Sequence, residues 1–201
     1  MGSEPYTINK VGDQFKGLDN KYIDAINKAQ EIKEIIKAGN TPEALAKRRA
    51  HNDKMVHEGW TPISSAVDSA ASGSVIPPEI ADGYEIVDSP GSLSDQFWTS
   101  ATGELIPNIG QRTIYCLTRE GSVRPMTYQI APVEKPLNAV CDILKTKHRV
   151  IFDDEGSFIQ DKATGEIHWL REDNGNFMLD VWALPPQYIT SNNNQLFVRQ
   201  P

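Results

Sequence analysis

The sequence lacks most of the patterns that identify a cofactor or metal protein. Its only cysteines, Cys116 and Cys141, are too few for a disulfide framework and lack C-x-x-C spacing, so we interpret them as small buried residues. The phosphate-binding loop, the dinucleotide-binding glycine pattern and the G-x-S-x-G nucleophile turn are missing. We therefore expect neither a cofactor nor a bound metal.

Long apolar runs and positive charge are also scarce. No apolar run approaches the roughly 20 residues of a membrane-spanning helix, and no basic segment followed by an apolar one opens the chain. The formal net charge is -7, whereas nucleic-acid-binding surfaces concentrate Lys and Arg. We expect a soluble cytoplasmic or nuclear protein that binds neither membranes nor nucleic acids.

The first part of the chain has a helical pattern. Apolar residues recur at spacings of three and four from Tyr22 to Ile36, and Gly39 occupies the position of a C-terminal cap. Thr41-Pro42-Glu43 then supplies an N-cap, a first-turn proline and an acid, which predicts a second helix to about Met55. We assign residues 1–58 to an N-terminal α-helical hairpin that extends the main domain.

The histidines do not have the spacing of a metal site. His51 and His57 are six residues apart, which does not place them on one helix face as an i, i+4 pair. The other two, His148 and His168, fall in predicted strands with no nucleophile motif nearby. We interpret all four as surface residues.

From Gly59 onward the pattern changes to that of strands. Short runs rich in Val, Ile, Tyr and Phe are separated by Gly-containing turns about every ten residues, which is typical of a β-sandwich or β-barrel. Asn174-Gly175 is the strongest hairpin signal, between strands at 167–170 and 177–182. One short helix fits Asn138 to Lys145. We assign residues 59–186 to the β domain and 187–201 to a C-terminal tail.

The stretch from Ala66 to Pro78 sets one acid, Asp68, between two short apolar runs among small residues. This pattern predicts a strand, a tight turn and a second strand. A carboxylate in such a place requires a hydrogen bond, an ion pair or a second carboxylate that shares its proton. Asp68 is therefore the first candidate for a chemical role.

Five segments, spread over residues 60–184, form one recognisable order along the chain: Val67-Asp68-Ser69-Ala70-Ala71, Thr99 to Gly110, Pro136 to Val140, His148 to Phe152, and Phe177 to Asp180. Together these segments resemble retropepsin-like aspartic proteases of the copia-retrotransposon type. The run from Val150 to Gly165 is most similar to the retropepsin-like sequences that dinoflagellate genomes carry in many copies.

The resemblance implies a mainly β fold: a closed retropepsin-like barrel with one short helix. It implies an aspartic endopeptidase in which Asp68 is the catalytic acid and base, Ser69 orients it and Ala70 completes the turn. Because the chain has no second D-[ST]-[GA] turn, the pair of carboxylates requires a homodimer. The hairpin tip at Ala101, Thr102, Gly103 and Glu104 would close over an extended peptide or polyprotein substrate.

The sequence departs from that family at three positions. Ala70 replaces a glycine that lets backbone, water and substrate approach closely, and Asn138 and Ala139 replace the residues that pack beneath the catalytic turn. These departures leave two alternatives open. One is a catalytically inactive domain of the same fold that serves as a binding or structural subunit of a larger assembly. The other is a β-sandwich unrelated to proteases.

Overall fold

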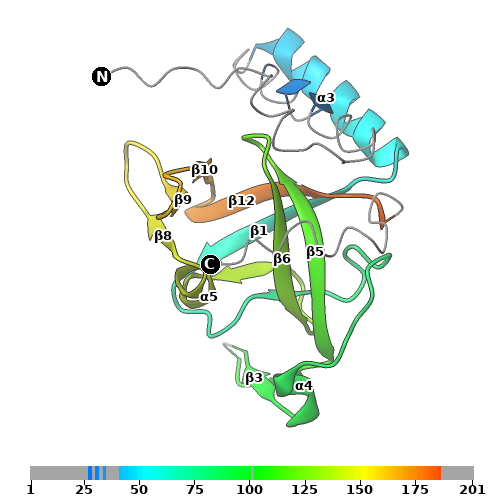
Figure 1. The fold of residues 1–201 in the computed structure, drawn as a ribbon, viewed down its shortest axis with the longest axis vertical. Coiled ribbons are helices and arrows are strands. Elements are labelled where there is room, and N and C mark those ends of the chain that lie inside the picture. Colours follow the sequence, from blue (N-terminus) through cyan, green and yellow to red (C-terminus); the bar gives the residue numbers. More distant parts are fainter. Residues whose placement is uncertain (1–26, 29, 32–33, 35–40, 101, 187–201) are drawn as a thin grey trace.

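The computed structural model describes residues 27–28, 30–31, 34, 41–100 and 102–186. Over this part of the chain the protein is mainly β, as the sequence predicts (Figure 1). A ring of strands occupies the middle of the molecule, with helix α3 at one end and the β3–β4 hairpin and α4 at the other. None of the helices described is long and apolar enough to cross a bilayer.

Most elements are short. The helices are α3 (Pro42–His57), α4 (Pro90–Leu93) and α5 (Val140–Lys145). The first strands are β1 (Thr61–Asp68), β2 (Val75–Ile76), β3 (Phe97–Thr99), β4 (Leu105–Pro107), β5 (Gly110–Thr118) and β6 (Val123–Ile130). The remaining strands are β7 (Leu137–Ala139), β8 (His148–Ile151), β9 (Phe158–Asp161), β10 (Ile167–Trp169), β11 (Arg171–Asp173) and β12 (Asn176–Ala183).

The pairing of the main sheet returns to its starting strand. Its order is β1-β7-β2-β6-β5-β12-β11, and β1 also pairs with β12 from Thr61↔Ala183 to Ala66↔Met178. The β1–β7 and β2–β6 pairs are parallel, whereas the other pairs of this ring are antiparallel. Strands β10, β9 and β8 form a separate three-stranded sheet.

The core lies inside the ring because alternate residues of its strands point inward. In β1 the buried positions are Ile63, Ser65 and Val67, which alternate along the strand. A second buried cluster joins α3 to the ring through Met55, Trp60, Leu117 and Leu184.

The second predicted helix is confirmed as α3. The Thr41 side chain accepts a hydrogen bond from the Ala44 N–H at 3.2 Å, and Pro42 follows in the first turn. The first predicted helix lies outside the described residues apart from residues 27, 28, 30, 31 and 34, which are helical. The tail at 187–201 also lies outside them.

The Asn174-Gly175 turn is confirmed, but its first strand is not the one predicted. Both residues have positive φ, 50° and 77°, as a type I′ turn requires. The turn connects β11 to β12, whereas residues 167–169 form β10 and pair with β9. Leu170 separates the two strands: its N–H donates to the Ser157 carbonyl oxygen at 2.9 Å, and its side chain lies in the core.

The prediction of a single short helix is wrong. Helix α4 also forms, because Ser89 and Ser92 make a reciprocal capping box and Pro90 occupies the first turn. Helix α5 begins at Val140 rather than Asn138, since residues 137–139 pair with β1 as strand β7.

Two of the histidines predicted at the surface are buried. His51 is 9% exposed on α3, where burial lowers the pKa of its imidazole despite Glu31 at 3.8 Å. His168 is 5% exposed in β10 and bonds to Glu120 at 3.1 Å. Glu31 and Glu120 are the polar partners of these two buried imidazoles. Residue spacing in the sequence does not predict either pair. Cys116 is buried as predicted, whereas Cys141 is half-buried.

Candidate functional site

Asp68 is the last residue of β1, at the point where that strand separates from β12. Pairing with β12 stops at Ala66↔Met178, whereas pairing with β7 continues to Asp68↔Ala139. The carboxylate is half-buried, and its Oδ1 accepts the Ala70 N–H at 2.7 Å. The predicted strand and tight turn are therefore present, and this hydrogen bond fixes the Asp68 side chain at the start of the turn.

The end of the turn is bonded to β7 and α5. The Ser74 N–H donates to Asp142 Oδ2 at 2.8 Å, and the Ser74 hydroxyl accepts the Ala139 N–H at 3.0 Å. The Cys141 thiol lies 3.6 Å from the Ala71 carbonyl oxygen. Burial opposes the charge on Asp142, but hydrogen bonds from Lys145 and Ser74 outweigh it and lower the carboxyl pKa. The turn is thus held by an ionised side chain.

The polar residue Asn138 has a partner beneath the turn. Its amide donates to the Ser65 hydroxyl, which in turn lies 3.4 Å from the Leu179 carbonyl oxygen. Asn138 is 6% exposed and Ser65 is fully buried. The pair meets the requirement that buried polar groups be hydrogen-bonded, so this departure from the family pattern is accommodated within the fold.

Ala70 does not have a positive φ. The non-glycine residues with positive φ in the described part of the chain are Ala81, Asp95, Lys147 and Asn174. A glycine is therefore not required at position 70 for conformational reasons. Both Ser69 and Ala70 are exposed, so the Ala70 methyl group lies on the accessible side of the turn.

A groove of ≈ 390 Å³ opens beside Asp68. Its lining comes from β1, from Leu137 of β7, from the residue after β8 and from the β11–β12 turn. The lining residues are Ala66, Val67, Asp68, Ser69, Leu137, Phe152, Gly175, Asn176 and Phe177. Asp68 is the one ionisable side chain among them, so a single chain contributes one carboxylate to this groove.

Phe152 and Phe177 form the apolar wall of the groove. Their ring centroids lie 4.8 Å apart at an interplanar angle of 34°. Phe152 is 42% exposed, and Phe177 is half-buried against the core. Both rings belong to segments that carry the sequence resemblance, but residue spacing alone does not connect them to Asp68, because they follow it by more than 80 residues.

An ion pair joins β11 to β12 next to the groove, and a hydrogen bond from Ser64 connects this pair to β1. Arg171 donates from Nε and Nη2 to the two Asp180 oxygens at 2.7 and 3.1 Å. The Ser64 hydroxyl of β1 donates to Asp180 at 2.7 Å. Burial opposes the charge on Asp180, but these bonds outweigh it and lower the pKa of its carboxyl group.

Strands β3 and β4 form the predicted hairpin. They pair from Phe97↔Pro107 to Thr99↔Leu105. At the tip, Thr102, Gly103 and Glu104 are exposed and do not line the groove, while Ala101 lies outside the described residues. The hairpin approaches the turn through Trp98, whose Nε1 lies 3.7 Å from the Cβ position of an alanine at Gly73.

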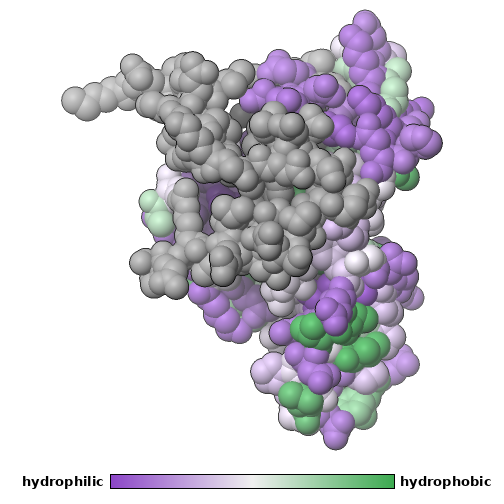
Figure 2. All heavy atoms as spheres, turned by 45° about the vertical axis from the view of Figure 1, so that its right-hand side comes forward, coloured by the Kyte–Doolittle hydropathy of each residue, from purple (hydrophilic) through white to green (hydrophobic). Residues whose placement is uncertain are grey.

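The same hairpin and α4 carry exposed apolar side chains. Leu93 is 72% exposed, Leu105 is 62% exposed and Phe97 is 52% exposed. Figure 2 shows apolar surface at the lower end of the molecule, where these elements lie. Such surface is available for contact with a peptide or another chain.

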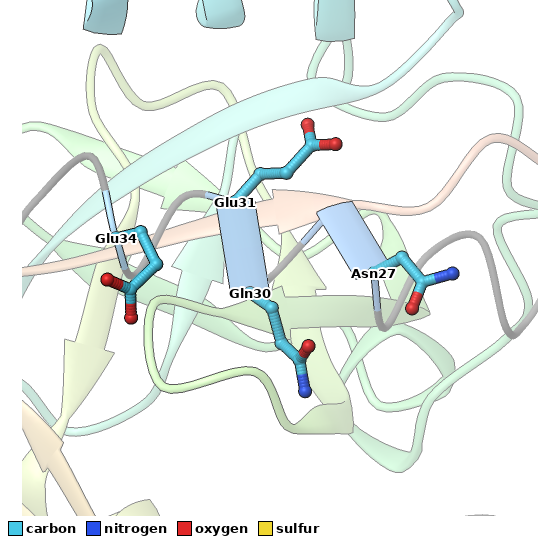
Figure 3. A pocket seen from close by; sticks show the side chains of 4 residues that line it. All are labelled: Asn27, Gln30, Glu31 and Glu34. Atoms are coloured by element: carbon cyan, nitrogen blue, oxygen red, sulfur yellow. The ribbon is translucent and has the colours of Figure 1, made fainter. Parts of the chain in front are cut away.

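A second cavity, of ≈ 510 Å³, is a poor candidate for a site. It is lined by Asn27, Gln30, Glu31 and Glu34. In Figure 3 these side chains point in different directions rather than toward a common point. Within the described ranges, no three His, Cys, Asp or Glu side chains are grouped as a metal site would require.

Comparison with known proteins does not place the chain in a family. No protein-family model matches it, and no curated protein matches it.

Proposed function

We propose that the chain is an aspartic endopeptidase of the retropepsin-like type that acts on extended peptides or polyproteins as a homodimer. The observation that carries the proposal is the position of Asp68. It ends a strand of the ring, faces an open groove and begins a turn that is bonded to β7 and α5. The sequence resemblance over residues 60–184 supports the same assignment.

The chemistry requires two Asp68 carboxylates, one from each chain. At a separation of about 3 Å such a pair holds one proton between them. The ionised member takes a proton from the attacking water, and the protonated member donates a hydrogen bond to the scissile carbonyl oxygen. The two-fold axis of the dimer would pass between the turns, where Ser69 is exposed and free to bond to its partner turn.

In this proposal the β3–β4 hairpin closes over the bound peptide. Its exposed apolar residues offer contact area, and an extended peptide can bond to strand edges by β-strand addition. Trp98 Nε1 lies 3.7 Å from the Cβ position of an alanine at Gly73, so β3 lies next to the turn that carries Asp68.

One observation favours the alternative of an inactive binding subunit. The Ala70 side chain is exposed on the turn, where water and substrate would have to approach closely. A methyl group at this place can prevent attack while leaving the fold and the groove intact.

The test is cleavage of a mixed peptide library by the purified full-length chain between about pH 4 and 6, followed by mass spectrometry. The proposal expects cleavage that Asp68→Asn abolishes without unfolding the protein. Asp154→Asn, an exposed acid in another turn, is the matched control and should retain activity. Sedimentation of the same samples should show a dimer.

Ala70→Gly separates the two candidate functions. If the Ala70→Gly variant cleaves peptides and the original chain does not, the original chain is an inactive subunit. The Ala70 methyl group is then what prevents cleavage. If neither cleaves, or if the protein is strictly monomeric, the endopeptidase proposal is wrong.

A further inference from the structure

We propose that helix α4 and the outer face of the β3–β4 hairpin form a docking surface for a cationic amphipathic segment of a partner protein. Its apolar residues are Leu93, Phe97 and Leu105, and its acidic residues are Asp88, Asp95 and Glu104. The inference does not depend on the proposed function, because it concerns the side of the hairpin that faces away from the Asp68 turn. It applies equally to an active protease and to an inactive subunit.

The two faces of the hairpin differ in exposure. Residues that pair across antiparallel strands lie on one face, and neighbours along a strand lie on opposite faces. Trp98 and Ile106 pair on the inner face, where both are half-buried and Trp98 approaches Gly73. Phe97 and Leu105 therefore lie on the outer face, where they are 52% and 62% exposed. The described part of the chain leaves this apolar face uncovered.

Helix α4 extends the apolar face and is fixed to the base of the hairpin. The Gln96 N–H donates to the Gly91 carbonyl oxygen at 2.9 Å, and the Asn108 N–H donates to the Gln96 carbonyl oxygen at 3.0 Å. The helix carries Leu93, which is 72% exposed. Figure 2 shows apolar side chains gathered at this end of the molecule. These backbone bonds set the positions of helix and hairpin before a partner binds, which lowers the entropic cost of binding.

The charge beside these apolar side chains has one sign. Residues 79–111 contain no Lys or Arg, and their acids are Glu79, Asp82, Glu85, Asp88, Asp95 and Glu104. Three of these acids, Asp88, Asp95 and Glu104, are exposed next to α4, β3 and β4 in the chain. No ion pair involves any of the three in the part of the chain that the structure describes. Their charges are therefore available to a cationic partner.

The sign of the charge identifies the class of partner. Lys or Arg side chains beside an apolar stripe complement the docking surface, whereas the negative charge of a lipid surface is repelled by it. Two copies of the same surface would bring like charges together, which opposes self-association through this face. An amphipathic helix with apolar residues at i, i+3, i+4 and i+7, and with Lys beside them, has the required pattern.

The experiment titrates the full-length protein with a fluorescein-labelled synthetic helix of about 18 residues that carries Leu at this spacing and Lys on both flanks. We expect binding that weakens as the salt concentration rises, because salt screens the exposed charges. A second peptide, with Glu in place of every Lys, should bind at least about 10-fold less tightly.

Variants of the protein locate the bound peptide. Phe97→Ser and Leu105→Ser should each weaken binding at least about 10-fold, as expected for central apolar contacts. Glu104→Gln should weaken binding about 2- to 5-fold and reduce its salt dependence. Val56→Ser and Glu155→Gln are the matched controls. They remove an exposed apolar side chain from α3 and an exposed acid from another turn, so the affinity should be unchanged.

Melting temperatures are measured for all variants, and if Phe97→Ser fails to fold, Leu105→Ser decides the outcome. The inference is overturned if the Glu peptide binds as tightly as the Lys peptide, or if neither apolar variant weakens binding. It is also overturned if Asp68→Asn weakens binding, because the peptide would then lie in the groove.

Two further measurements exclude other occupants of the surface. Vesicles that contain phosphatidylserine should not retain the protein. Retention that Leu105→Ser abolishes would assign the surface to a membrane and overturn the inference. Sedimentation of Leu105→Ser should match that of the original chain. A dimer that this variant dissociates would assign the surface to a second copy of the chain and overturn the inference as well.

Discussion

The backbone N–H of Ser74 donates to Asp142 Oδ2 at 2.8 Å, across 68 residues of sequence. This bond ties the end of the Asp68 turn to the first turn of α5. Lys145 bonds to the other oxygen of the same carboxylate, also at 2.8 Å. Asp142 therefore connects the turn, the helix and a surface cation, and its removal should affect the turn before the rest of the ring.

Asp142→Ala should lower the free energy of unfolding by roughly 1–3 kcal/mol, because the Ser74 N–H loses its acceptor. Urea denaturation measures this loss, and amide exchange at residues 70–74 should accelerate. Lys145→Ala is the matched control: it removes an exposed partner of the same carboxylate and leaves the Ser74 bond in place. An equal loss in both variants would show that the turn bond contributes nothing.

Asp180 should make the stability of the protein depend on pH in the acid range. Its pKa is lowered in the folded state, so the stabilisation is fully present above the pKa of about 4 in the unfolded chain. It is lost as the pH falls through the lower, folded value. Because Arg171 is partly exposed, the effect should be about 1 kcal/mol. Unfolding followed from pH 6 to pH 2 in the original chain and in Asp180→Asn measures it, and the variant should show the smaller decline.

Asn138→Leu tests the buried amide beneath the turn. The substitution removes the amide that donates to the buried Ser65 hydroxyl, and we expect a loss of roughly 1–3 kcal/mol. Combining it with Ser65→Ala removes both polar groups, so the double variant should lose less than the sum of the single variants. Strictly additive losses, measured by urea unfolding, would contradict a direct bond between the two side chains.

The sequence predicted those features of the fold that depend on a few neighbouring residues, such as helix starts and tight turns. Thr41 and Pro42 predicted the start of α3, and Asn174 and Gly175 predicted their turn. Each of these outcomes depends on the conformational preferences of neighbouring residues. The first strand of the Asn174-Gly175 hairpin was assigned wrongly because Leu170, an apolar residue in an apolar run, gave no indication of the break.

The groove could be predicted only in part. Asp68 was identified because a carboxylate between apolar runs requires an explanation, but its neighbours Phe152 and Phe177 come from pairings distant in sequence. Burial of His168 depends on Glu120, 48 residues earlier, in the same way. Such contacts cannot be predicted from residue spacing in a single sequence. The order of strands in the sheet, and not the distance along the chain, brings these residues together.

Gly73, in the Asp68 turn, and Gly110, at the start of β5, should respond to alanine in opposite ways. At Gly73 the new methyl group would lie no closer than 3.7 Å to Trp98. Gly73→Ala should therefore be tolerated, and reduced freedom of the unfolded chain should add about 0.4–1 kcal/mol. At Gly110, φ is 152° and a Cβ would lie 2.7 Å from the Val87 carbonyl oxygen, so Gly110→Ala should lose roughly 1–3 kcal/mol. Thermal and urea unfolding of both variants measure the difference. Destabilisation of Gly73→Ala comparable to that of Gly110→Ala would mean that the hairpin packs more tightly on the Asp68 turn than the Trp98 distance indicates.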